Sequence, residues 1–211
     1  PSKHNSAYPE PEDTVNNMSS LEIMRQLPTD VSSDFNEYLD KVITEDIGQL
    51  YTNDLEAMAR INEIQSFNSS AALDAGFNLS PKEDKVQQSV ELSVATYMRL
   101  NAGGLNVSEI NKVFANAKAK FTVKDFHNGD WNSATKLQKQ LAKQKHDFVF
   151  DTTKQGYLPR FVSMALASEE FNSMLDVRII TPRPTQSKSW FDTVATWFNY
   201  VMSWLSSQYV K

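Results

Sequence analysis

One short stretch of the sequence gathers titratable side chains close enough to act as a general acid and a general base. Asp125, His127 and Asp130 lie within six residues of one another, and a histidine beside carboxylates can move protons near neutral pH. The same stretch contains Asn128 and Gly129, and turns are rich in Asp, Asn and His for backbone reasons. A tight turn is therefore the favoured interpretation, and an enzyme that uses these three side chains is the alternative.

The rest of the sequence lacks a recognisable catalytic or metal-binding motif. The other histidines, His4 and His146, are far apart, and none has a metal-ligand spacing such as HExxH. Cysteine is absent, which removes thiolate nucleophiles, disulfides and cysteine metal sites together. The glycine pair at 103–104 fits the end of a helix and not a phosphate-binding loop. We therefore expect no metal, no cofactor and no enzymatic activity.

A basic stretch lies in the middle of the chain, with eight lysines between positions 112 and 145. Such a patch can follow a phosphate backbone or an anionic membrane. Arginine is absent there, few aromatic residues are interleaved, and the lysines spread around their predicted helices, so a solvated surface is the favoured interpretation. The alternative, a nucleic-acid site, would use Lys112, Lys118, Lys120, Lys136, Lys139 and Lys143.

The C-terminal stretch, residues 189–211, predicts a strongly two-sided aromatic helix. It carries three of the four tryptophans, spaced seven apart. At about 100° per residue, its apolar side chains cover roughly half of the circumference. The opposite half is uncharged except for Asp192. The residues that we expect to contact a partner through the apolar half are Trp190, Phe191, Val194, Trp197, Phe198, Val201, Met202, Trp204 and Leu205.

Three kinds of surface would cover this apolar half: the body of the chain itself, a groove on another protein, or a membrane interface. Pro182 and Pro184 precede the helix, and an extended linker favours docking away from the body. Docking on a partner and packing on the chain itself remain nearly equal alternatives. The membrane interface comes third, because the polar half lacks the basic residues that interfacial helices carry.

The other helices can be predicted from their caps and apolar stripes. The clearest start is Ser80-Pro81-Lys82-Glu83, with a serine cap, proline at the first helical position and glutamate at the third. This helix is expected to continue to about Leu100. Further helices are expected at 21–27, at 71–75, from a cap at Ser108 to about 121, at 133–146, and after Pro159. The stretch from about 32 to about 67 is expected to form either one long bent helix or an antiparallel pair.

The apolar stripes also predict which side chains face inward. On the helix at 133–146 we expect Leu137 and Leu141 to be buried. The short apolar run at 148–150 is expected to be a buried connector. The other side chains expected to face inward are Val86, Val90, Val94, Tyr97, Ile110, Val113, Phe114, Ala117, Phe121, Phe161, Met164, Ala165, Met174 and Leu175.

The composition supports an all-α fold. The chain has 211 residues, of which 40% are hydrophobic, so it can bury a core. Only six glycines and almost no alternating pattern argue against a sheet of any size. We predict an irregular multi-helix bundle with a disordered N-terminal arm at 1–18, a helical body at 19–180, a Pro-containing linker at 181–188 and an amphipathic C-terminal helix at 189–211.

Charge and hydropathy bear on location. Residues 1–100 hold 17 acidic and 7 basic residues, and residues 101–211 hold 9 and 14, so the surface is polarised by chance or to attract oppositely charged partners. The first twenty residues contain no apolar segment of a signal peptide, and no run of 18 apolar residues exists. We expect a cytoplasmic protein without a membrane-spanning helix.

The glycine-poor helical composition, rich in Asn, Ser and Lys, resembles that of accessory subunits and effectors of Dot/Icm-type type IV secretion systems. The opening HNSAYPEPEDTVNN, at residues 4–17, and the helix pattern behind it resemble an accessory subunit of the coupling complex of these systems. The resemblance implies a non-enzymatic cytoplasmic subunit of a complex at the inner membrane that handles effector proteins. No motif aligns, so it assigns no role to any residue.

These observations favour a non-catalytic structural or adaptor subunit of a larger protein assembly, attached through its C-terminal helix. Its partners would be other protein subunits. The alternative from another class is an effector or toxin that binds a membrane surface with the same helix.

Overall fold

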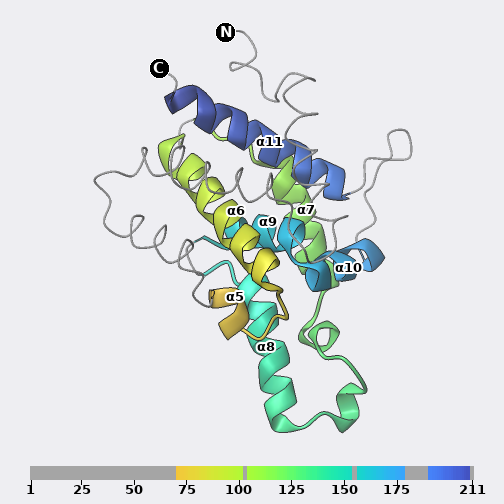
Figure 1. The fold of residues 1–211 in the computed structure, drawn as a ribbon. Coiled ribbons are helices and arrows are strands. Elements are labelled where there is room, and N and C mark those ends of the chain that lie inside the picture. The colour runs from red at the N-terminus through yellow and green to blue at the C-terminus, as the bar shows by residue number, and fades with distance from the viewer. Residues whose placement is uncertain (1–69, 102–103, 154–155, 179–189, 210–211) are drawn as a thin grey trace.

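The computed structural model describes residues 70–101, 104–153, 156–178 and 190–209, which form α-helices and short 3₁₀ helices with no strand among them (Figure 1). The predicted all-α class is confirmed. The predictions for residues 1–69 and for the linker at 181–188 lie outside the described residues. The elements are α5 (Ala71–Asp74), α6 (Pro81–Leu100), α7 (Ser108–Lys120), η3 (Val123–Phe126), η4 (Trp131–Ser133), α8 (Lys136–Phe150), α9 (Tyr157–Ala167), α10 (Glu169–Arg178) and α11 (Trp190–Tyr209).

Helix α6 begins where the sequence predicts, because Ser80 and Glu83 form a capping box. The Ser80 hydroxyl accepts a hydrogen bond from the Glu83 N–H at 3.1 Å, and the Glu83 carboxylate accepts one from the Ser80 N–H at 3.0 Å. The second carboxylate oxygen of Glu83 accepts from the N–H of Glu169 at 2.8 Å, at the start of α10. One glutamate therefore satisfies orphan N–H groups at the beginnings of two helices.

The body is a bundle in which α6 packs most extensively against α9, and α11 contacts α6, α7 and α9. In Figure 1, α11 lies across one end of this bundle, over α6 and α7. The predicted stripe of α6 is buried, and its members Val94 and Tyr97 are fully enclosed. The predicted stripe of α7 is buried as well, from Ile110 to Phe121.

Phenylalanine rings from several elements form one cluster at the centre of the body. Phe150, at the end of α8, stacks on Phe121 with 5.8 Å between ring centroids and meets Phe171 of α10 at 6.1 Å. Edge-to-face and offset contacts of this kind add to the free energy of apolar burial. The cluster comprises Phe77, Phe114, Phe121, Phe126, Phe148, Phe150, Phe161 and Phe171.

Several predicted boundaries are wrong. The helix expected at 133–146 is α8, and it starts later because Thr135 and Gln138 form its capping box. The run at 148–150 is buried as expected, but it forms the last turn of α8 and not a connector. Periodicity cannot distinguish a three-residue apolar run in a helix from one in a connector. The cap of α7 is Val107, without a side-chain bond, so Ser108 is its first residue.

The helix expected after Pro159 is also divided into two. Pro159 occupies the third position of α9, and the chain breaks at Ser168 before α10 begins. The Ser168 hydroxyl accepts a hydrogen bond from the Phe171 N–H at 3.1 Å, which is the way a helix N-cap works. The interior residue Leu175 therefore lies on a helix separate from that of Met164.

A part of α8 projects from the body together with the segment before it (Figure 1). We call residues 127–145 the arm. It contains the bend at Gly129, whose φ of +128° suits glycine, then η4 and the first ten residues of α8. Beyond the arm, the end of α8 turns inward to the phenylalanine cluster.

Candidate functional site

The predicted contact residues of the C-terminal helix are buried within the chain itself. Trp190 is 2% exposed and Trp197 is 1% exposed. The indole Nε1 of Trp190 donates to a carboxylate oxygen of Asp176 at 2.7 Å, and that of Trp197 donates to the backbone oxygen of Asn106 at 2.6 Å. Both indoles therefore have their apolar surface and their N–H group satisfied by other helices and loops of this chain.

Most of the other apolar side chains of α11 whose burial the structure describes are covered in the same way. Trp204 is partly buried, with its ring 5.3 Å from that of Tyr97, and the side chain of Leu205 lies outside the described residues. Asn199 and Tyr200, from the half predicted to be polar, are buried as well. The other predicted contact residues that are buried are Phe191, Val194, Phe198, Val201 and Met202.

This packing removes the exposed surface on which the prediction that α11 attaches the chain to a partner depended. That prediction required an exposed row of tryptophans, and the structure instead uses them to hold α11 on α6 and α7. Of the alternatives that the sequence left nearly equal, packing on the chain itself is the one observed. An amphipathic pattern indicates which face of a helix is covered, but not which molecule covers it.

The acid and base candidates at the turn serve as caps. A carboxylate oxygen of Asp125 accepts hydrogen bonds from the N–H and hydroxyl of Thr122, at 2.8 and 3.3 Å. Asp130 accepts from the Ser133 hydroxyl at 2.7 Å and from the Asn132 N–H at 3.2 Å. These bonds hold the pKa of Asp130 below its ordinary value.

His127 completes this turn by placing its ring against Trp131, with 5.9 Å between centroids. The turn interpretation thus accounts for all three side chains. Within the described ranges, no three His, Asp or Glu side chains come together as a metal site would require. Among the helices in those ranges, none is long and apolar enough to cross a membrane.

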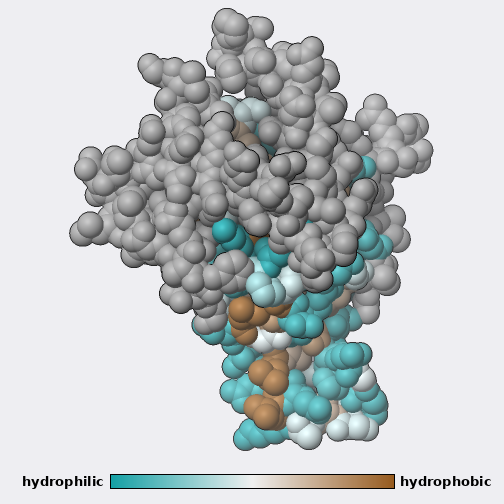
Figure 2. Space-filling model, viewed as in Figure 1, coloured by the Kyte–Doolittle hydropathy of each residue, from teal (hydrophilic) through white to brown (hydrophobic). Residues whose placement is uncertain are grey.

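The arm carries the exposed apolar surface of the described chain. Leu137 is 65% exposed and Leu141 is 42% exposed, which corrects the prediction that both face inward. They lie one turn apart on α8, and Figure 2 shows an apolar strip on the arm bordered by hydrophilic residues. The side of α8 that is covered carries Ala142 and Val149 instead, and α8 packs there with η3 and α9.

The arm has internal contacts that hold its shape. Besides the capping box at Thr135, the Lys139 ammonium lies over the ring of Trp131 at 5.3 Å from its centroid, a cation–π contact. Because Trp131 also meets His127, the segment before α8 is fixed against the helix. The exposed leucines therefore stand on an ordered support.

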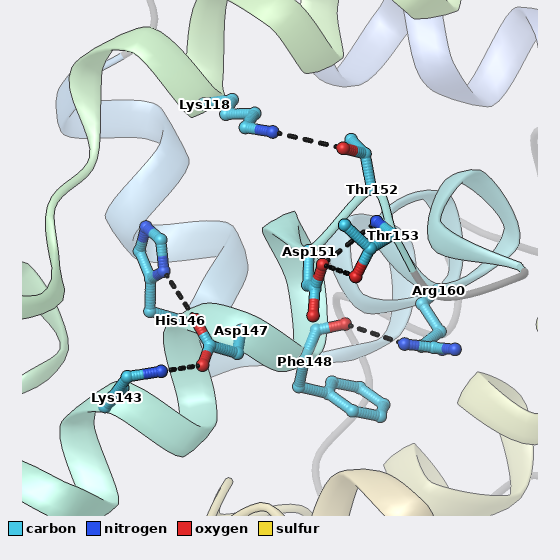
Figure 3. Close-up of polar contacts among 9 residues, drawn as sticks. All are labelled: Lys118, Lys143, His146, Asp147, Phe148, Asp151, Thr152, Thr153 and Arg160. Carbon is cyan, nitrogen blue, oxygen red and sulfur yellow. Dashed lines mark hydrogen bonds and ion pairs between the residues drawn. The ribbon is translucent and has the colours of Figure 1, made fainter.

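The end of the arm and the residues that follow it, up to Thr152, are tied to the body by polar contacts (Figure 3). Arg160 of α9 donates to the backbone oxygen of Phe148 at 3.5 Å, and Lys118 of α7 donates to the Thr152 hydroxyl at 3.5 Å. Lys145 pairs with Glu170 of α10. These contacts come from three helices of the body, so the arm has a fixed direction relative to it.

A further polar group lies on α8 where the arm meets the body. Figure 3 shows Lys143 and His146 both directed at the carboxylate of Asp147, at 2.5 and 3.3 Å. Partial burial opposes ionisation of Asp147, but the hydrogen bonds from Lys143 and His146 outweigh it and hold the pKa of Asp147 below its ordinary value. The same contact raises the pKa of Lys143. Lys143, His146 and Asp147 thus form an ion-paired group that contains no nucleophile.

The lysines considered for nucleic acid fall into two separate groups. Lys112, Lys118 and Lys120 lie on α7, whereas the second group lies on α8. On α8, Lys139 faces Trp131 and Lys143 faces Asp147. The spread of lysines predicted from the sequence is thus what the structure shows.

Sequence reasoning missed the arm because it assigned both leucines of KLQKQLAKQK to the core. A signal was nevertheless present. Residues 131–146 contain four lysines, three glutamines and no acidic residue, which is an unusual surrounding for two core leucines.

Comparisons with known proteins give no match to a protein family, a curated protein or a solved structure.

Proposed function

We propose that this chain is a non-catalytic protein-binding subunit of a larger assembly, attached through the arm and not through α11. The observation that carries the proposal is the exposure of Leu137 and Leu141 on an ordered helix that projects from the body. Large apolar side chains that stand together at the surface mark sites of contact with other molecules. A projecting helix can enter a groove on a partner without a change in the body.

The polar contacts of the described chain support a binding role over a catalytic one. The three side chains that would serve as acid and base are occupied as caps and ring contacts. The ion pair of Lys143 and Asp147 lies on the exposed helix that we assign to binding. In this proposal these groups position the arm.

The earlier alternative, a membrane-binding effector, is not favoured. It requires the apolar face of α11 at the membrane, but Trp190 and Trp197 are enclosed by the body. The resemblance to type IV secretion coupling complexes provides a setting for the proposal, namely a cytoplasmic assembly at the inner membrane. That setting rests on the resemblance alone, and the experiment below does not depend on it.

Photo-crosslinking from the arm tests this function. A photoreactive amino acid is placed at Gln140, which is exposed beside the leucines, in full-length protein expressed in the cells that produce it. We expect a crosslink to one defined protein, which is lost in the double variant Leu137→Ser, Leu141→Ser. The matched control carries the same group at Ala119, an exposed position on α7, and should not give that crosslink.

Three results would oppose the proposal. One is a crosslink from Ala119 equal to that from Gln140. Another is a crosslink that persists in the folded double variant. The third is the absence of any protein adduct from the arm at native abundance.

A further inference from the structure

We infer that the partner of the arm presents an acidic amphipathic helix, which lies along α8 with apolar side chains on Leu137 and Leu141 and carboxylates toward the surrounding lysines. This inference rests on the proposed function and adds the chemistry of the partner. It follows from three properties of the arm: its charge, its backbone and the size of its apolar surface.

The charge of the arm is opposite to that of the chain. The whole chain has a net charge of −5, whereas the arm carries four lysines and one carboxylate, Asp130, which caps η4. Lys136 is exposed and has no carboxylate partner among the described residues. Lys143 has a side chain that is 67% exposed, so its contact with Asp147 leaves room for a second carboxylate. Complementary charge speeds association and selects the partner.

The backbone of the arm limits the mode of contact. Inside α8 the N–H and C=O groups are bonded to one another, so a peptide cannot add to it as a strand adds to a sheet edge. Contact must be made by side chains. Leu137 and Leu141 form a ridge of residues four apart, which is the surface that the groove of another helix accepts. A partner helix with apolar residues three and four apart matches this ridge.

The surroundings of the ridge leave space for such a helix. At the base of the arm, Gly76 lies beside α8: a Cβ at this position would be 4.0 Å from Leu141 Cδ2 and 3.8 Å from Lys145 Cγ. Glycine has no side chain to cover the ridge at this point, and its φ of +105° disfavours any other residue. Leu137 and Leu141 are 65% and 42% exposed, so both ends of the ridge are accessible to a partner.

A second copy of this chain fits the arm less well. Two arms in a symmetric contact would place lysines against lysines, which is unfavourable. An arm that docks on the body of another copy makes a heterologous contact, which continues into open chains unless the rotation closes.

A membrane surface also fits less well. An interfacial helix buries a broad apolar face with aromatic residues. In the described part of the chain the large apolar side chains counted as exposed are Leu137 and Leu141, while Trp131 is turned toward Lys139 and His127. Two leucines are a small area for binding a bilayer but suffice as the centre of a helix–helix contact.

Designed peptides test the inference on the full-length protein. Three helical peptides share one length: the first has a leucine stripe flanked by glutamates, the second has the same stripe flanked by lysines, and the third keeps the glutamates with alanines in the stripe. Binding to ¹⁵N-labelled protein is followed by amide chemical shifts. We expect the first peptide to shift amides 136–145 and to bind at least about tenfold more tightly than either of the others, with weaker binding as salt rises.

Variants locate the site. Lys136→Glu, and separately Leu141→Ser, should each weaken binding of the glutamate–leucine peptide about fivefold or more. Lys112→Glu on α7 removes an exposed lysine outside the arm and should leave the affinity unchanged. Equal binding of the glutamate and lysine peptides, or shifts confined to residues outside the arm, would overturn the inference. The inference would also be overturned if the arm amides shifted with anionic phosphatidylglycerol vesicles, or on self-association of the protein, and did not shift with the peptide.

The two experiments separate the two proposals. If the crosslink from Gln140 depends on the leucines but the acidic peptide does not bind, the binding role stands and the partner chemistry is wrong. If the peptide binds the arm but no crosslink forms in cells, the surface has the inferred chemistry and the proposed function is wrong.

Discussion

The indole nitrogen of Trp197 donates a hydrogen bond to the backbone carbonyl of Asn106, 2.6 Å away and 91 residues earlier in the chain. Asn106 lies in the loop between α6 and α7, so this bond fixes α11 over the ends of both helices. The Trp197 ring also meets Tyr97 edge to face at 5.9 Å. A helix whose pattern suited a partner protein is therefore part of the core.

Replacing Trp197 by Phe should destabilise the folded protein by about 2 to 4 kcal/mol. The smaller ring leaves a cavity, and the carbonyl of Asn106 loses its donor. Because Trp197 is 1% exposed, neighbouring groups have little freedom to compensate. The free energy of unfolding is measured with urea, using helical circular dichroism.

The matched control is Trp131→Phe on the arm, where the indole is only partly buried. This substitution should lower the free energy of unfolding by less than about 1 kcal/mol. If both variants lose the same small free energy of unfolding, α11 is not held by the contact of Trp197 with Asn106.

Local signals predicted much of the fold. Ser80, Pro81 and Glu83 define the start of α6 by chemistry confined to one turn, and the valine stripe behind them is buried as expected. The tryptophan spacing likewise predicted α11. The sequence could not predict that the chain itself covers α11. The bond from Trp197 to Asn106 joins residues 91 apart, and no local sequence pattern around either residue indicates this contact.

The arm shows the opposite failure. Leucines four apart in a helix normally face a core, so Leu137 and Leu141 were assigned inward. The covered side of α8 is instead set by Val149 and Phe150, which are buried in the core, and by the packing of η3 on α8. Two turns before Val149, the same side of α8 carries Ala142. Leu137 and Leu141 point in a different direction around the helix. The candidate site was thus predictable only from its lysine-rich surroundings.

Substitutions on α8 should separate its two sides. Leu137→Ala should change the free energy of unfolding by no more than about 0.5 kcal/mol, because the side chain is already in water. Val149→Ala should cost about 1 to 3 kcal/mol, because Val149 is fully buried. Both substitutions place the same residue in the same helix. Thermal and urea unfolding of the two variants would show comparable losses if Leu137 were a core residue.

Glu83 should matter more than its capping partner Ser80. Its two carboxylate oxygens accept from the N–H groups of Ser80 and Glu169, so Glu83→Ala leaves orphan donors on two helices. We expect a loss of about 2 kcal/mol, against about 1 kcal/mol for Ser80→Ala. Amide hydrogen exchange of Glu169 should accelerate in the first variant and not in the second. Unchanged protection of that amide in Glu83→Ala would show that α10 does not depend on the contact.

Tyr97 should make the protein sensitive to alkaline pH. Burial raises the pKa of Tyr97 to about 12, and the neighbouring Tyr200 adds to the shift. A tyrosine in the unfolded chain ionises near pH 10, so between about pH 10 and pH 12 the unfolded chain loses this proton while the folded protein keeps it. The stability contributed by neutral Tyr97 is complete below about pH 10 and is lost as the pH rises toward 12, a change of about 2 to 3 kcal/mol.

The variant Tyr97→Phe isolates this effect from the other groups that titrate in alkali. The Tyr97 hydroxyl makes no hydrogen bond of good distance and angle, although Tyr200 and Asn101 lie near enough to affect its pKa. The variant should therefore differ from the wild type by less than about 1 kcal/mol at pH 7. Because phenylalanine cannot ionise, its free energy of unfolding should fall less steeply than that of the wild type above about pH 10. Parallel slopes for the two proteins in urea unfolding up to about pH 11 would mean that Tyr97 is not kept neutral by the contacts that α6 makes with α11.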